Sequence, residues 1–233
     1  TIMFELEDKD YYFLLDSSKS PTSIYCFTSL ESLSEFNSNK CELKNDKSTA
    51  IPLFQCQIYS DINILLNTNK NYLILNKYLL NDDLCFDKKI EYCKIKNKRP
   101  LKTGFKINRV YDIDFLTNNN IKKIGMKYFR FHDYVEINCL DVPDFDNAKW
   151  VYKNNTENVI TNGFTTNDQY TLVSNGHIIA EYKDLKDSES IGNLVVQNSN
   201  KGLDEQIVAM TFVLLTHQRY RDQSVSLNNG LLI

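Results

Sequence analysis

The chain has 233 residues, of which 42% are hydrophobic, 12% aromatic and 24% charged. Its 14 Tyr and 13 Phe supply more apolar surface than a disordered chain carries, and 7 Gly with 4 Pro exclude a collagen-like sequence. The net charge of −3 gives no general reason to bind nucleic acid, because domains that do so are usually strongly basic. No linker rich in Pro, Gly or Ser divides the chain, so we expect a single domain over residues 1–233.

Apolar side chains alternate with polar ones over many short segments of the chain. The clearest segment runs from Phe105 to Phe115, where Asp112 and Asp114 fall on the face opposite Tyr111. This pattern is typical of a half-buried antiparallel strand. Similar segments predict further strands at Tyr11–Leu15, Thr22–Thr28, Phe54–Tyr59, Asn63–Asn67, Tyr72–Leu75, Glu91–Ile95, Ile121–Phe131, Tyr134–Cys139, Lys149–Tyr152, Tyr170–Val173, Ile178–Tyr182 and Gly192–Val196. We therefore expect about a dozen strands.

Turn residues between these segments predict hairpins. The strongest signal is Asn175-Gly176, which lies between the predicted strands Tyr170–Val173 and Ile178–Tyr182. Both residue types adopt the positive φ angles that a type I′ turn requires. The asparagine run at 118–120 is a less specific signal of the same kind. We expect the hairpin at Asn175-Gly176 to be the most reliable one in the chain.

One segment, Leu203–Arg221, departs from the period of two. Between Ile207 and Leu215 apolar residues cover every side of a helical wheel, so this helix must be surrounded by other elements. Asp204 is its expected N-cap. The segment Ser29–Phe36 predicts a short surface helix that is too small to cover the first. Since no second helical layer is evident, we expect a mainly β fold, a closed antiparallel barrel of about twelve strands around one buried C-terminal hydrophobic helix.

Three segments in the second half of the chain carry a family resemblance. The first is residues 170–182, two predicted strands with an Asn-Gly turn that end in Ile-Ala-Glu-Tyr. The second is the Gly-x-Leu strand of 191–196, and the third is the apolar helix that starts at 203–210 and ends with the basic residues of 219–221. Over about residues 105–221 the sequence resembles the tubby C-terminal-like superfamily. The likeness is closest to uncharacterised fungal members, which are relatives of the LURP-one and phospholipid scramblase families. The resemblance implies a twelve-stranded closed barrel around a buried helix.

Two functions follow from the resemblance as expectations. Tubby resembles an adaptor that reads phosphoinositide headgroups with basic side chains, and scramblases are proposed to move lipids and carry a C-terminal membrane segment. The last residues here, Leu231-Leu232-Ile233, are too few for such a segment. The family's headgroup-binding residues align with no particular positions, so the resemblance assigns no site residue.

The strongest local charge is at Lys88–Arg109, which holds nine basic residues and one acidic residue, a net of +8. Clustered lysines and arginines bind anionic surfaces and phosphates. We therefore expect an anion, headgroup or partner site here, made of Lys94, Lys96, Lys98, Arg99, Lys102 and Lys106. The alternative is a solvated loop flanked by strand faces whose lysines protect the sheet from aggregation.

Motifs for catalysis and for cofactors or metals are absent from the sequence. The three His are far apart, no Cys-x-x-Cys pair or GxSxG occurs, and the glycine-rich phosphate loops are missing. Asp141, Asp144 and Asp146 lack the glycine and glutamate spacing of a calcium loop. We expect no cofactor and no metal site, six reduced cysteines, and Trp150 as an anchor in the barrel wall.

These features predict a non-enzymatic binding or adaptor module that works through its outer surface, either as a protein–protein scaffold or as a reader of anionic membranes. We expect a protein partner, an anionic lipid surface as the other candidate, and no nucleic acid. The longest uncharged apolar stretch is nine residues, so we expect no transmembrane segment. The first residues, Thr1 to Glu5, show no basic start and no long apolar run, so we expect no secretory signal. With reduced cysteines, the expected location is the cytoplasm, peripheral at a membrane if the chain reads lipid. The alternatives are an open-barrel lipid carrier and a hydrolase that uses, for instance, Asp112, Asp114 and His132.

Overall fold

The computed structural model describes residues 7–18, 20–38, 50–63, 68–81, 86–98, 107–116, 122–129, 132–139, 141–142, 145, 147–154, 168–185, 189–197 and 203–229. Within these residues the chain forms strands and two helices. The strands are β1 Lys9–Asp16, β2 Thr22–Phe27, β3 Phe54–Asn63, β4 Thr68–Leu80, β5 Phe86–Lys98, β6 Ile107–Phe115, β7 Lys123–Phe129, β8 Tyr134–Asn138, β9 Lys149–Asn154, β10 Asp168–Ser174, β11 His177–Asp184 and β12 Gly192–Val196. The helices are α1 Leu30–Ser38 and α2 Asp204–Asn229.

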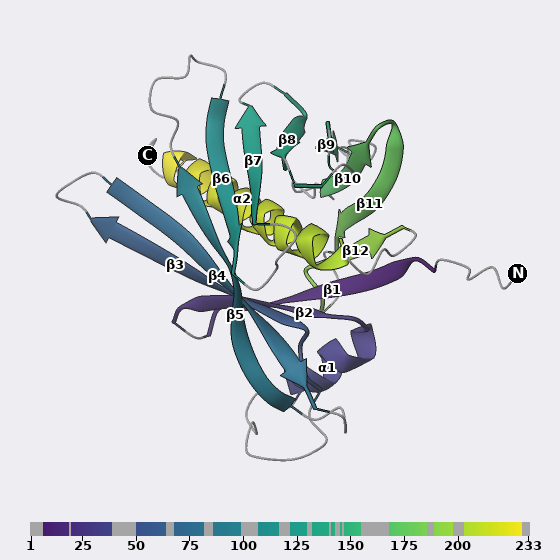
Figure 1. Ribbon diagram of the computed structural model, residues 1–233. Helices are drawn as coiled ribbons and strands as arrows, with labels where there is room; N and C mark the ends of the chain where they lie inside the picture. Colours follow the sequence, from purple (N-terminus) through teal and green to yellow (C-terminus); the bar gives the residue numbers. More distant parts are fainter. Residues whose placement is uncertain are drawn as a thin grey trace, which may run out of the picture.

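The strands form one closed antiparallel barrel (Figure 1). Each strand pairs with the strands next to it in the sequence, and β1 closes the barrel by pairing with β12, where Lys9 lies opposite Val196 and Phe13 opposite Gly192. This up-and-down order leaves none of these strands with a free edge. The predicted fold class is therefore confirmed.

The predicted Asn-Gly hairpin is also confirmed. Asn175 and Gly176 have φ angles of 50° and 80°, and Ser174 pairs with His177 across the turn. Of the predicted strand Asn63–Asn67 only Asn63 is described, as the last residue of β3; the rest lies outside the described residues, as does the asparagine run at 118–120. Strands β4 and β5 are longer than predicted, because pairing extends them through polar residues that show no apolar alternation.

Helix α2 is enclosed by the barrel. All residues from Gln206 to Thr216 are buried, and those from Ile207 to Leu214 have no exposed surface at all. They belong to one hydrophobic core together with inward-facing side chains of the strands, among them Phe13, whose ring lies edge-on to Phe212 at 5.3 Å. A side chain that bordered an open cavity would retain accessible surface. Therefore no side of this part of α2 faces a cavity.

Polar contacts fix α2 at both ends of its buried segment. At the start, the Tyr11 hydroxyl donates to Asp204 at 3.1 Å, and the Gln206 amide donates to Tyr92 at 3.1 Å. At the other end, the Tyr111 hydroxyl and His217 Nδ1 share a hydrogen bond of 3.2 Å. Burial and the Asp204 carboxylate raise the pKa of Tyr11, so this phenol stays protonated and can donate.

The expected N-cap role of Asp204 is wrong. The Leu203 carbonyl accepts the first helical hydrogen bond, from the backbone N–H of Ile207 at 3.0 Å, so Leu203 occupies the N-cap position. Asp204 is the first helical residue, and its carboxylate accepts from Tyr11 on β1 instead. A tertiary hydrogen bond has thus replaced the local cap that the sequence pattern favours.

The short helix predicted at Ser29–Phe36 is α1, which lies outside the barrel against β1 and β2 (Figure 1). Ser29 caps it by accepting from the backbone N–H of Ser32 at 3.1 Å. Leu33 and Phe36 bury against Phe27 and Tyr25 in a second, smaller core. Trp150 is fully buried in the main core, as expected for a wall anchor.

Truncating the enclosed helix should destabilise the whole barrel. Phe212→Ala removes a fully buried ring, and we expect it to lower the free energy of unfolding by about 3–5 kcal/mol. Ile178→Ala, at an exposed position, should change it by less than about 0.5 kcal/mol. Urea unfolding followed by the fluorescence of Trp150 measures both. Equal effects would mean that α2 is not part of the core.

Candidate binding surface

The predicted basic site lies partly on the outer face of β5. Lys94 and Lys96 point away from the core, because the residues that alternate with them, Cys93 and Ile95, are fully buried. The backbone of Lys98 ends the strand. The other predicted site residues, Arg99, Lys102 and Lys106, lie outside the described residues.

Acidic side chains compensate the two described lysines. Lys94 forms an ion pair with Glu91 at 3.0 Å, and Lys96 forms one with Asp114 of β6 at 2.9 Å. The register places Asp114 opposite Lys94 and Asp112 opposite Lys96. The local sequence charge of Lys88–Arg109 therefore overstates the positive charge of this face.

The outer face of the barrel alternates in charge from strand to strand between β5 and β9. The outward side chains that are charged or amide are basic on β5, acidic on β6, basic on β7, acidic or amide on β8 and basic on β9, and Val110, Tyr134 and Val151 share this face with them. We call this face the striped wall, and its members are Lys94, Lys96, Asp112, Asp114, Lys123, Lys127, Glu136, Asn138, Lys149 and Lys153. Neighbouring stripes have opposite sign, so cross-strand pairs such as Lys96–Asp114 stabilise the wall by about 0.2–1 kcal/mol each.

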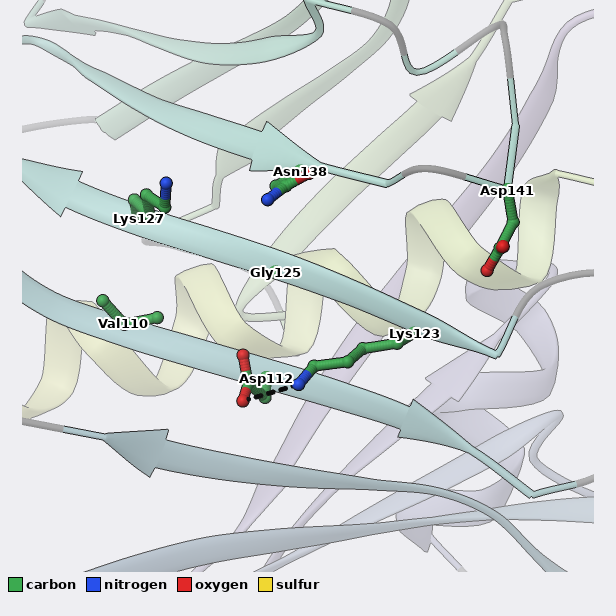
Figure 2. A pocket seen from close by; sticks show the side chains of 7 residues that line it. All are labelled: Val110, Asp112, Lys123, Gly125, Lys127, Asn138 and Asp141. Carbon is green, nitrogen blue, oxygen red and sulfur yellow. Dashed lines mark ion pairs between the residues drawn. The ribbon is translucent and has the colours of Figure 1, made fainter.

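A groove of about 330 Å³ opens on the striped wall over β6, β7 and β8 (Figure 2). Its lining is Val110, Asp112, Lys123, Gly125, Lys127, Asn138 and Asp141. Gly125 lies in the middle of β7, between Asp112 of β6 and Asn138 of β8, and forms the floor. The groove exists because this outward position of β7 carries no side chain.

The groove contains an ion pair whose carboxylate is nearly buried and whose lysine is exposed. Asp112 is only 7% exposed although it faces outward, and Lys123 of β7 reaches toward β6 and pairs with it at 3.0 Å (Figure 2). Asp141, at one end of the groove, accepts a hydrogen bond from the backbone N–H of Lys122 at 3.2 Å. Two lysines and two aspartates line the groove, so its formal charge is balanced.

Sequence reasoning missed this groove. The signal was Lys123-Ile-Gly-Met-Lys127, where a glycine occupies an outward strand position between two outward lysines. A period of two in hydrophobicity distinguishes only buried from exposed positions. A glycine on the polar face is compatible with that period, so it gives no sign of a groove. The lining from β6 and β8 becomes part of the site only through strand pairing.

The carboxylates and histidine named for a hydrolase do not converge. Asp112 and Asp114 form ion pairs with Lys123 and Lys96, whereas His132 packs against Phe129 beyond the other end of the β6–β7 pair. In that register His132 lies past Ile107, which is five residues or roughly 17 Å along the strand from Asp112. This particular catalytic set is therefore excluded.

The metal-ligating residue types in the described part of the chain form no metal site, and its cysteines are packing residues of the core. No three His, Cys, Asp or Glu side chains within it are grouped as metal ligands. Cys26, Cys56, Cys93 and Cys139 are free and buried, and burial raises their pKa, which keeps them as unreactive thiols. Cys41, Cys85, Asp144 and Asp146 lie outside the described residues. Over the same residues, neither helix has the length and hydropathy needed to cross a bilayer.

The fold and this surface define a class of protein: a closed up-and-down barrel that is filled by its own C-terminal helix and is charged in stripes on its outer wall. The family model DIA1 matches residues 14–227, which includes nearly all of the barrel and the helix. The chain therefore belongs to the DIA1 family. Neither the curated proteins nor the solved structures contain a match to it.

Two glycines should respond oppositely to alanine. A Cβ at Gly125 would meet no atom closer than 3.7 Å, so Gly125→Ala should raise the free energy of unfolding by about 0.5 kcal/mol, since glycine costs conformational entropy in a strand. A Cβ at Gly192 would overlap the buried ring of Tyr182, so Gly192→Ala should lower it by about 1–3 kcal/mol. Urea unfolding of both variants measures the difference, and a destabilising Gly125→Ala would show that the fold itself requires this glycine.

Proposed function

We propose that this chain is a non-enzymatic binding or adaptor module that docks a partner protein on the striped wall. The observation that supports it is the division of the barrel into a filled interior and a charged exterior. Helix α2 occupies the space in which barrel proteins commonly hold small ligands. The outer surface is therefore the part of the molecule that remains for binding.

The alternation of charge favours a protein as the partner. An anionic bilayer or a nucleic acid presents one sign of charge and would meet the acidic stripe of β6 as well as the lysines beside it. A protein surface can carry both signs in a complementary order, and such complementarity gives specificity and register. The closed barrel also gives a partner no edge on which to add a strand, so docking must use side chains.

Membership in the tubby C-terminal-like superfamily is part of this proposal. The twelve-stranded barrel around a buried C-terminal helix is compatible with it. The proposed location is the cytoplasm, and the free buried thiols of Cys26, Cys56 and Cys93 are in keeping with a reducing compartment.

Reversing charge on the striped wall should release the partner. Lys94→Glu with Lys149→Glu changes two stripes, whereas Lys9→Glu with Lys183→Glu makes the same net change on exposed residues of β1 and β11. Tagged wild type and both variants are captured from native cells and compared by quantitative mass spectrometry. We expect at least one protein to fall about tenfold with the wall variant and to stay with the control variant. Identical captures for both variants would contradict docking on this wall.

A reader of anionic membranes is the second candidate, and one feature favours it. At the β4–β5 hairpin, Leu80 and Phe86 are 46% and 52% exposed, and Lys88 next to them is exposed as well. Apolar side chains beside a basic one are typical of residues that enter a membrane interface while lysine contacts anionic headgroups. The predicted basic residues lie further along the same strand and beyond it.

Vesicle flotation separates the two candidates. If the chain reads anionic lipid, wild type should float with vesicles that contain phosphatidylinositol 4,5-bisphosphate and not with phosphatidylcholine alone. The variant Lys94→Glu/Lys96→Glu/Lys98→Glu/Arg99→Glu should then lose most of this binding, and salt should weaken it. Equal flotation of wild type and variant would remove the basic segment as a headgroup site.

A further inference from the structure

Gly125 has no structural reason to be glycine. Among the described glycines only Gly176 has a positive φ, so the backbone at Gly125 suits any residue. A Cβ there would make ordinary contacts, the nearest at 3.7 Å to Asn138. Glycine in a strand interior lowers stability, and one that is not needed for a bend marks a place where another molecule approaches the backbone closely. The groove above Gly125 is such a place.

The polar side chains that line this groove differ in whether they have a hydrogen-bond or ion-pair partner. Asp112 is held by Lys123, and Asp141 accepts from the backbone of Lys122. Within the described part of the chain, the ammonium of Lys127 and the side-chain amide of Asn138 have no hydrogen-bond or ion-pair partner. Figure 2 shows both on the side of Gly125 opposite Asp112. The two carboxylates of the groove are therefore engaged, whereas the ammonium of Lys127 and the amide of Asn138 are not.

The charges that line the groove decide which kind of acceptor group from another molecule can bind there. Lys127 and Asn138 can bind one carboxylate through charge-assisted and neutral N–H donors. A phosphate carries about two negative charges and would be repelled by Asp112 and Asp141, which line the same groove. Since the ion pair with Lys123 offsets the charge of Asp112, a group with a single negative charge is tolerated.

We propose that this groove is the docking site for an acidic side chain, Asp or Glu, of the partner protein. Its carboxylate lies above Gly125 and accepts from Lys127 Nζ and from the amide of Asn138. Lys123 contributes by neutralising Asp112. This inference rests on the proposed function, because it names the anchor by which a partner would hold the striped wall.

Nuclear magnetic resonance of the full chain tests the groove with a defined probe. The ¹⁵N-labelled protein is titrated with acetyl-Gly-Glu-Gly-amide, acetyl-Gly-Gln-Gly-amide and acetyl-Gly-phosphoSer-Gly-amide. We expect the glutamate peptide to shift the backbone amide of Gly125 and the side-chain amide of Asn138 at millimolar concentration, with the other two at least about tenfold weaker. Equal shifts with the glutamine peptide, or none at Gly125 and Asn138, would overturn the proposal; a stronger response to phosphoserine would replace the carboxylate by a phosphate.

Matched variants separate the groove from general surface charge. Lys127→Gln should weaken the glutamate peptide about tenfold, whereas Lys153→Gln, the same change on β9 of the wall, should leave it unchanged. Gly125→Leu fills the groove and should abolish the shifts at Asn138. If Gly125→Leu unfolds, the pair of lysine variants still decides the outcome, because both change exposed or half-buried side chains. Equal affinity of Lys127→Gln and wild type would refute the site.

The outcome is independent of the test of the striped wall. If the wall variant loses its partner and the peptide does not bind, the partner docks on the wall without this anchor. If the peptide binds and the wall variant keeps every partner, the groove takes a carboxylate but the proposed docking face is wrong.

Discussion

Helix α2 is apolar around its whole circumference, and the rest of the structure follows from the need to keep it from water. Twelve strands provide the enclosure by turning one face of each inward against residues 206–216. Hydrogen bonds from Tyr11 and Tyr111 to opposite ends of the buried segment set the position of the helix along the barrel. Core and barrel therefore depend on each other, because neither the helix nor a hollow ring of strands could bury its apolar surface alone.

In the proposed function, the filled interior leaves the outer surface to provide binding specificity. A barrel with its own helix inside presents only outward side chains, turns and loops to other molecules, and its paired strands prevent the addition of a foreign strand. In the proposed function, specificity comes from the order of charges on the outer wall and from local grooves. The striped wall has both, since Lys96 and Asp114 pair across strands and Gly125 leaves a groove beside them.

Because of the stripes, the net charge of a sequence segment differs from the net charge of the surface on which that segment lies. Lys94 and Lys96 belong to a strongly basic stretch of sequence, yet in the barrel they lie opposite Asp114 and Asp112, which come from the next strand. Each lysine therefore has a carboxylate within one strand spacing, and this carboxylate lowers the positive electrostatic potential at the surface. The hairpin end near Lys88 and Phe86, which the second proposed function concerns, lies away from these two cross-strand positions.

The sequence by itself determined a closed barrel of about twelve strands, the Asn175-Gly176 hairpin and the enclosed helix. These features follow from local periodicity and turn chemistry, which record the side of each element that is buried. Only the tertiary structure decided which outward residues meet: that Asp112 pairs with Lys123, that Gly125 forms a floor and that Asn138 stands beside it. Outward residues obey no burial period, so their neighbours are set by strand register, which a single sequence does not record.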